Sequence, residues 1–201
     1  MSEMKNIVVY CSSREDISQS YKDCARLLGE WIGKQGHKLV YGGVHAGLMS
    51  ITAQAVHDNG GKVLGVVPEM FMHRSSHLND ELIATENLNG RKAVMIETGD
   101  VYVVLPGGIG TLDEWVSTLS HNVVSGSSKK LLIVNLDGVF DYQWKQIAET
   151  ASSPFANGDV MKLMVEAKSA DEMIAQLEQL TATGYFTVEN GVISWTNAPV
   201  A

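Results

Sequence analysis

The chain has 201 residues, of which 45% are hydrophobic and 19% are charged, and its formal net charge is −8. The length suits one domain with a sizeable core. The acidic balance argues against a nucleic-acid-binding protein, which usually carries a basic face. No apolar run approaches the roughly 20 residues that a membrane-spanning helix needs.

The cysteines and the N-terminal region indicate the compartment. Cys11 and Cys24 are the only cysteines and form no C-x-x-C pair, so we expect a reducing, cytoplasmic setting. The first strand-like segment, residues 7–11, is too short for the core of a signal peptide. Cys11 itself is expected to be a small buried hydrophobic residue.

Strand-like and helix-like patterns alternate along the chain. Strands are expected at 7–10, 38–41, 62–67, 82–85, 101–105, 131–135 and 163–167, with a loop at 69–80. Helices are expected at 18–35, 48–58, 89–97, from 110 onward, at 141–149 and at 170–180. This alternation predicts an α/β fold, with a doubly wound parallel sheet that has helices on both faces.

The C-terminal segment departs from this alternation. Asn190-Gly191 lies between two β-prone runs within residues 185–196, which is a strong signal for a β-hairpin. We therefore expect a single nucleotide-binding domain over residues 1–182 and a hairpin tail over residues 183–201. A lone hairpin is marginally stable in water, so a structural or interface role is expected for it.

The run 101–114 is the most informative part of the chain for function. It reads as a buried strand, then Pro106, then the glycines Gly107, Gly108 and Gly110, and then a helix that opens at Thr111. Free backbone N–H groups at a helix start bind anions, so this pattern predicts a phosphate site. Glu114 follows on the same helix face. Because a carboxylate repels phosphate, it is expected to act on the atoms next to the phosphate.

Other segments add weaker signals. Residues 42–49 repeat the strand, glycine loop and helix scheme, so either they face the same crevice or they form only a tight turn. Arg91-Lys92 suits contact with a phosphate or a base edge, although exposed basic pairs are commonplace.

His73 and His77 lack a third ligand, so no metal is expected. Contacts with phosphate or ribose are expected from Ser12 and Ser13, and the further binding candidates are Gly42, Gly43, Gly47 and Met49.

Residues 106–114, together with Arg91-Lys92 and segment 41–49, resemble the LONELY GUY family of cytokinin riboside 5′-monophosphate phosphoribohydrolases. The resemblance runs from about residue 7 to about residue 180. It implies a Rossmann-like fold and at least a homodimer that uses no metal or organic cofactor. It also implies catalytic roles for Arg91 and Glu114 and a phosphate loop made by Gly107, Gly108, Gly110 and Thr111, with Lys92 as a neighbour.

The activity that this resemblance implies is hydrolysis of the N-glycosidic bond in a purine nucleoside 5′-monophosphate such as AMP or an N6-modified AMP. The alternative is a non-catalytic carrier or sensor of a phosphorylated ligand, like the molybdenum-cofactor carriers. A third possibility is an interaction protein in which the glycine loops are only structural. Segment 70–72 is a candidate lining of the base pocket, and 121–128 departs from the family as a polar, mobile stretch.

Overall fold

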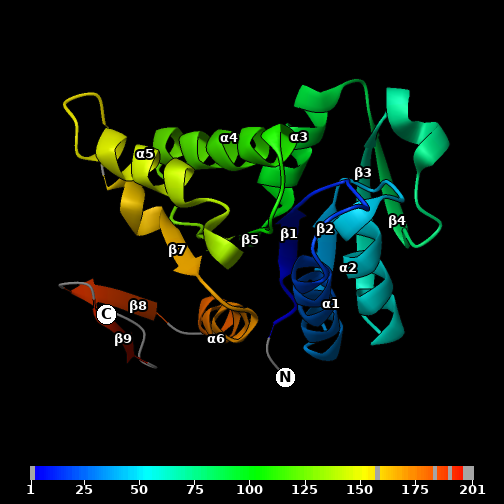
Figure 1. Cartoon of the computed structure of the whole chain (residues 1–201), viewed down its shortest axis with the longest axis horizontal. Coiled ribbons are helices and arrows are strands. Elements are labelled where there is room, and N and C mark those ends of the chain that lie inside the picture. Colours follow the sequence, from blue (N-terminus) through cyan, green and yellow to red (C-terminus); the bar gives the residue numbers. More distant parts are fainter. Residues whose placement is uncertain (1–2, 157–158, 183–184, 190–191, 197–201) are drawn as a thin grey trace.

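The computed structural model describes residues 3–156, 159–182, 185–189 and 192–196. Seven parallel strands form the main sheet, in the order β4-β3-β2-β1-β5-β6-β7 (Figure 1). The strands are β1 (Asn6–Tyr10), β2 (Lys38–Tyr41), β3 (Lys62–Pro68), β4 (Glu81–Thr85), β5 (Val101–Val104), β6 (Leu131–Val134) and β7 (Met164–Ala167). The longer helices are α1 (Gln19–Lys34), α2 (Gly47–Asp58), α3 (Leu88–Thr98), α4 (Ile109–Ser125), α5 (Asp141–Ala151) and α6 (Ala170–Thr181).

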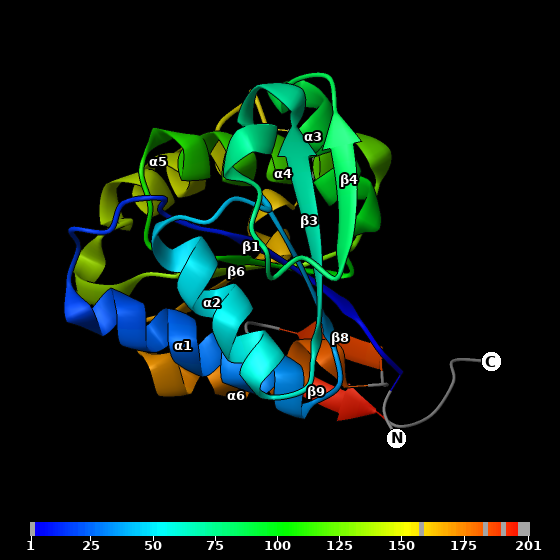
Figure 2. The ribbon, with the colours of Figure 1, turned by 90° about the vertical axis from the view of Figure 1, so that its right-hand side faces the viewer.

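The helices form two layers, one on each face of the sheet. Helices α1, α2 and α6 cover one face, and α3, α4 and α5 cover the other (Figures 1 and 2). On the first face Leu28 and Ile32 pack against the strands, and on the second the largest buried side chain is Trp115. Because both faces are buried, the strands are almost continuously apolar, as is usual for parallel sheets.

The strand order reverses at β1, which pairs with β2 on one side and with β5 on the other. In open α/β sheets, ligands bind in the crevice at such a switch point, outside the carboxyl ends of the strands. The segments that leave β1 and β5 are joined there by a hydrogen bond from the Ser12 backbone N–H to the Pro106 carbonyl, 3.1 Å long. The topology therefore places the crevice between residues 11–14 and residues 106–111.

The alternating pattern correctly predicted the α/β class and the doubly wound sheet, and the Rossmann-like fold that the family resemblance implied is confirmed. Two local predictions were wrong. The expected loop at 69–80 contains a 3₁₀ helix at Glu69–Arg74. Of the stretch 121–128 that was expected to be mobile, residues 121–125 form the end of α4, which Gly126 terminates with a φ of 71°. The Asn122 side chain holds the following turn by donating to the Lys129 carbonyl at 2.9 Å, so polar residues here stabilise the helix end.

The tail contains the predicted hairpin strands. Strands β8 (Tyr185–Glu189) and β9 (Val192–Thr196) pair antiparallel in a sheet of their own. The turn predicted at Asn190-Gly191 lies outside the described residues. Within the described ranges, no helix is long and apolar enough to cross a membrane. The division into a domain at 1–182 and a tail at 183–201 stays a prediction.

Candidate functional site

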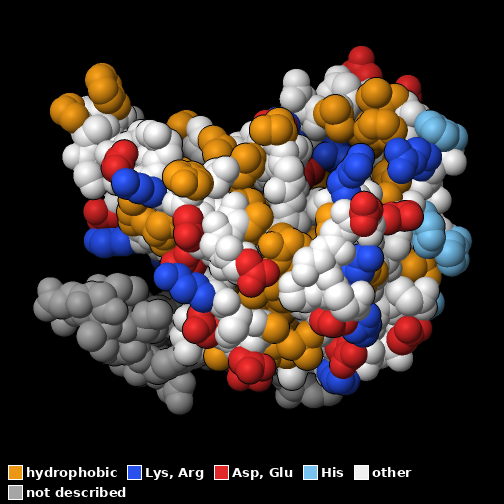
Figure 3. Space-filling model, in the orientation of Figure 1, with side chains coloured by type: hydrophobic (Ala, Val, Ile, Leu, Met, Phe, Trp, Pro, Cys, Tyr) orange, Lys and Arg blue, Asp and Glu red, His pale blue; other side chains and the backbone are white. Residues whose placement is uncertain are grey.

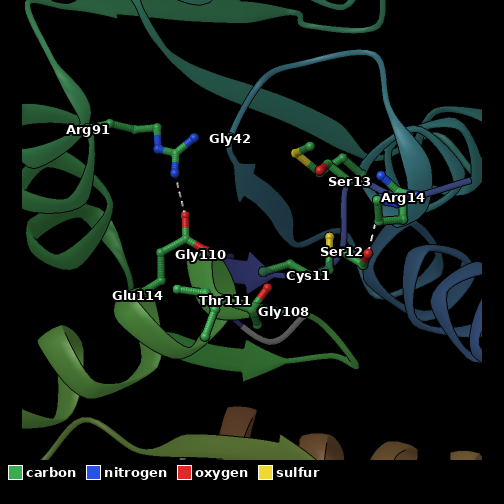
Figure 4. Close-up of a pocket in the computed structure, with 13 residues that line it drawn as sticks. Cys11, Ser12, Ser13, Arg14, Gly42, Arg91, Gly108, Gly110, Thr111 and Glu114 are labelled. Carbon is green, nitrogen blue, oxygen red and sulfur yellow. Dashed lines mark hydrogen bonds and ion pairs between the residues drawn. The ribbon is translucent and has the colours of Figure 1, made fainter.

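A cavity of about 300 Å³ opens at the switch point, between the loops that follow β1 and β5. Nine of the residues singled out in the sequence line it. They come from four separate segments of the chain: Ser12, Ser13, Gly42, Met49, Arg91, Gly108, Gly110, Thr111 and Glu114. Figure 4 shows that α3 and α4 bring Arg91 and Glu114 to one wall, while Ser12 and Ser13 lie on the opposite wall.

The N-terminus of α4 forms the floor of this cavity. Gly108 is the N-cap, and its carbonyl accepts the first helical bond from the Leu112 N–H at 3.0 Å. The N–H groups of the first three helical residues therefore lack partners within the helix. A Cβ added at Gly108 or at Gly110 would meet no atom within 4 Å. These glycines leave room for a ligand to approach the backbone closely.

Gly107 has a different role from its neighbours. A Cβ at this position would collide with the Thr111 side chain, and Gly107 is not among the cavity-lining residues. Its missing side chain lets Thr111, which is buried, pack against the loop. The motif therefore divides into one glycine needed for packing and two that face open space.

Arg91 and Glu114 form an ion pair across the cavity wall. Arg91 Nη2 lies 2.7 Å from Glu114 Oε1, and the side chains are only 16% and 10% exposed (Figure 4). Such a charge-assisted hydrogen bond fixes the orientation of both groups. The two side chains are brought together by the packing of α3 against α4, since they are separated by 23 positions in the sequence.

Burial raises the pKa of Glu114 to about 7, from an ordinary value of 4.5. The positive charge of Arg91 opposes this rise, the neighbouring Asp113 adds to it, and Lys92 opposes it. The loss of hydration therefore outweighs the ion pair in this position. A carboxyl group with a pKa near 7 can exchange a proton at neutral pH, which is the property required of a general acid or base.

The second glycine loop contributes less to the cavity than its sequence suggests. Gly43 and Gly47 adopt positive φ values of 68° and 47°, but neither lines the cavity. The Leu48 N–H at the start of α2 donates to the Ser12 carbonyl at 3.0 Å. A Cβ at Gly47 would lie 2.5 Å from the Ser13 backbone carbon. This loop holds the segment that follows β1, and only Gly42 and Met49 of it reach the cavity.

Lys92 also lies away from this cavity. Its Nζ contacts both carboxylate oxygens of Asp113 at 2.8 Å, and it lines a separate surface groove between α3 and α4. In segment 70–72, Met70 is 59% exposed, while Phe71 and Met72 pack against Val44 and Val67. None of the three is among the residues that line the cavity.

Four residues of the cavity were not among the candidate site residues of the sequence: Val9, Cys11, Arg14 and Ile109. Their position along the chain could have identified them, because each lies within or next to a segment that ends a strand or begins a helix at the switch point. Burial raises the pKa of the Cys11 thiol above its usual range, which disfavours the thiolate. No group of three or more potential metal ligands occurs among the described residues.

Comparison with known proteins identifies relatives of this chain. A family model described as "Possible lysine decarboxylase" matches residues 49–177. Cytokinin riboside 5′-monophosphate phosphoribohydrolase LOG of Oryza sativa subsp. japonica is 34% identical over 180 residues, which is 89% of this chain and 74% of the relative. LOG5 of Arabidopsis thaliana is 32% identical over 195 residues, or 96% of this chain and 83% of the relative.

Solved structures share the fold at lower sequence identity. The molybdenum cofactor binding protein of Rippkaea orientalis has a TM-score of 0.71 and 21% identity, over 90% of this chain and 99% of its own. The molybdenum cofactor carrier protein of Chlamydomonas reinhardtii has a TM-score of 0.70 and 21% identity, over 89% of this chain and 98% of its own. At this identity the likeness shows the Rossmann-like fold alone.

Proposed function

This chain belongs to the LONELY GUY family, and on that premise we propose that it hydrolyses the N-glycosidic bond of a purine nucleoside 5′-monophosphate. AMP or an N6-modified AMP is the proposed substrate, and the products are the free base and ribose 5-phosphate. The observation that carries the proposal is the Arg91–Glu114 pair, which lies buried beside the free amides of α4.

The 5′-phosphate binds at the N-terminus of α4. The backbone N–H groups of Ile109, Gly110 and Thr111 donate to its oxygens, and the helix dipole favours its charge. Open space above Gly108 and Gly110 supports this placement. Hydroxyl groups of Ser12 and Ser13 on the facing wall contact the phosphate or the ribose, because they line the same cavity.

The chemical step takes place beside Glu114. As the bond between C1′ and the base nitrogen breaks, both bonding electrons leave with the base and positive charge develops on the ribose. The ionised Glu114 carboxylate stabilises that charge and accepts a proton from the water whose oxygen bonds to C1′. The base takes up a proton from solvent as it leaves, and Glu114 then returns its proton to solvent. Arg91 orients the carboxylate and the substrate, since its guanidinium is held 2.7 Å from Glu114.

A carrier of a phosphorylated ligand is the second candidate, because solved carriers share the fold. A carrier needs the open α4 N-terminus but has no need for a buried carboxylate next to it. Burying Glu114 costs free energy, as its raised pKa shows. Perturbed carboxyl groups in clefts are a mark of catalytic sites, so the pair favours the enzyme.

The surface groove between α3 and α4 supports the proposed homodimer. Ile109, Val116 and Val124 lie along one side of α4 and are 81%, 50% and 86% exposed. All three line this groove, and Ile109 also lines the cavity. Exposed apolar stripes of this kind mark protein interfaces. A second copy packed here covers the stripe next to the cavity mouth.

Incubation of the protein with AMP tests the proposed reaction. Chromatography should show adenine and ribose 5-phosphate forming in equal amounts, and adenosine should be cleaved far more slowly because it lacks the phosphate. AMP that binds but is recovered intact after long incubation would identify a carrier. Equal affinity for AMP and adenosine in a calorimetric titration would remove the phosphate site from the proposal.

A further inference from the structure

Arg14 lies on the wall of the cavity that faces Arg91 and Glu114 (Figure 4). The backbone of segment 12–14 is fixed by three hydrogen bonds at the switch point. The Arg14 N–H donates to Ser12 Oγ at 3.0 Å, the Ser12 N–H donates to the Pro106 carbonyl at 3.1 Å, and the Ser12 carbonyl accepts from Leu48. Arg14 is therefore held on the wall opposite Arg91 and Glu114, and it remains exposed.

The charge of Arg14 is uncompensated within the described part of the chain. Arg26 pairs with Asp23 at 2.7 Å and Arg91 pairs with Glu114 at 2.7 Å, whereas neither Arg14 nor Arg74 has an ion-pair partner among the described residues. Of these two unpaired arginines, Arg14 lines the cavity and Arg74 does not. The chain carries a formal net charge of −8. An unpaired arginine on a cavity wall attracts an anionic ligand to that cavity, even in a protein that is acidic overall.

The charge balance at the α4 N-terminus leads to the same ligand. A phosphate monoester carries about −1.5 to −2 at pH 7, while a helix N-terminus offers the equivalent of about +0.5. Arg91 adds little, because Glu114 already neutralises it when ionised. A phosphate bound on α4 alone would therefore be undercompensated by about one charge, which is the charge that Arg14 provides.

We infer that Arg14 clamps the substrate's phosphate from the side opposite α4, so that it determines specificity for the phosphorylated form over the neutral nucleoside. This inference rests on the proposed function and deepens it. Arginine suits the role because its planar fork can donate two hydrogen bonds to one phosphate group. Figure 3 shows positive side chains scattered among acidic ones on one face of the molecule, so local placement at the cavity, and not overall charge, carries the selectivity.

The test is equilibrium binding of AMP and adenosine to Glu114→Gln protein, in which turnover is suppressed, with and without Arg14→Gln. Both measurements are repeated with Arg91→Gln added, because the loss of Glu114 frees the Arg91 charge that it neutralises. The loss of a charge-assisted bond at an exposed position should weaken AMP binding about tenfold and leave adenosine binding unchanged. Arg14→Lys should retain part of the affinity. Arg26→Gln is the matched control, an exposed arginine of α1 outside the cavity, and should change neither affinity.

Salt dependence gives a second measurement. The affinity for AMP should fall less steeply with ionic strength in Arg14→Gln than in the parent, because one screened charge contact is gone. If the parent prefers AMP and Arg14→Gln keeps the full preference and the same salt slope, the role of Arg14 is wrong while the proposed function stands. If the parent itself shows no preference for AMP, the proposed function fails.

Discussion

Two glycine loops of this chain look alike in sequence: residues 42–47, which lead into the first residue of α2, and residues 106–110, which lead into the first turn of α4. They differ in what faces the N-terminus of the helix. At α2, the Leu48 N–H is engaged by the Ser12 carbonyl and the Gly47 Cα faces the Ser13 backbone. At α4, Gly108 and Gly110 face open space. We call these the closed loop and the open loop.

The difference shows that a strand, glycine loop and helix sequence specifies a backbone turn but not its use. In the closed loop, glycine allows another segment of the chain to approach the helix N-terminus. In the open loop, glycine leaves the same kind of position free for a ligand. The chain thus uses one helix N-terminus to fix Ser12–Arg14 and the other to face the cavity that those residues line.

The largest expected effect is on kcat, which should depend on Glu114 beside the open loop and not on the closed loop. Glu114→Gln should lower kcat for AMP at least about a thousandfold, because an amide can neither stabilise the ribose cation by charge nor accept a proton. His45→Gln, an exposed position on the closed loop, should leave kcat within about twofold. Steady-state kinetics measure both, and a Glu114→Gln enzyme within about tenfold of the parent contradicts the catalytic role.

The pH dependence of the open site comes next. Because burial raises the pKa of Glu114 to about 7, the reactive carboxylate is depleted below neutrality. The value of kcat for AMP should fall about tenfold per pH unit below 7 and level off above it. Measurement at saturating AMP separates this limb from the second ionisation of the phosphate near pH 6. A kcat that stays constant from pH 5 to 8 would contradict the role.

The same raised pKa fixes the sign of a stability effect. The Glu114 carboxyl contributes fully to stability below about pH 4.5, where it is protonated in both the folded and the unfolded protein. This contribution is lost as the pH rises through about 7. The free energy of unfolding of both proteins is measured in urea. The value for Glu114→Gln, relative to that of the parent, should therefore rise by about 3 kcal/mol between pH 4.5 and pH 8.

The closed loop should respond to substitution through stability. Gly47→Ala places a methyl group 2.5 Å from the Ser13 backbone at a φ of 47°, so it should lower the free energy of unfolding by about 2 to 4 kcal/mol. Gly60→Ala also has a positive φ, 76°, but no neighbour within 4 Å. It should cost only about 1 kcal/mol. Equal losses in urea unfolding would mean that contact with Ser13 is unimportant.

The open loop should respond through binding. Gly108→Ala has a φ of −98° and no protein neighbour within 4 Å of the added methyl, so stability should remain within about 0.5 kcal/mol. The methyl group enters the space assigned to the phosphate, and AMP affinity should fall about tenfold. Gly90→Ala, whose nearest contact would be 3.6 Å away, is the control. Unchanged AMP affinity in Gly108→Ala would contradict the phosphate position.

Much of the fold could be predicted because it depends on local patterns. Short apolar strands alternating with amphipathic helices specify a doubly wound sheet, and the observed strands agree within one or two residues. The end of α4 could not be predicted, because His121, Asn122 and Ser125 interrupt its apolar pattern. They remain helical through contacts such as the bond from Asn122 to Lys129, which composition does not reveal.

The site shows the same division. The motif at 106–114 marked the open loop, since free amides at a helix start follow from backbone geometry alone. The pattern could not show that Lys92 turns toward Asp113 while Arg91 reaches Glu114. Adjacent residues on a helix point in different directions, and only the packing of α3 on α4 decides which of them meets the cavity.

By itself, the sequence determined the parallel sheet, the open helix N-terminus and the presence of an acid beside it, because each follows from residues close together in the chain. Tertiary structure alone decided which glycine loop is open, that Glu114 is buried against Arg91, and that Arg14 faces them. The physical reason is that burial and access depend on segments up to about a hundred residues apart, which meet only where the strand order reverses.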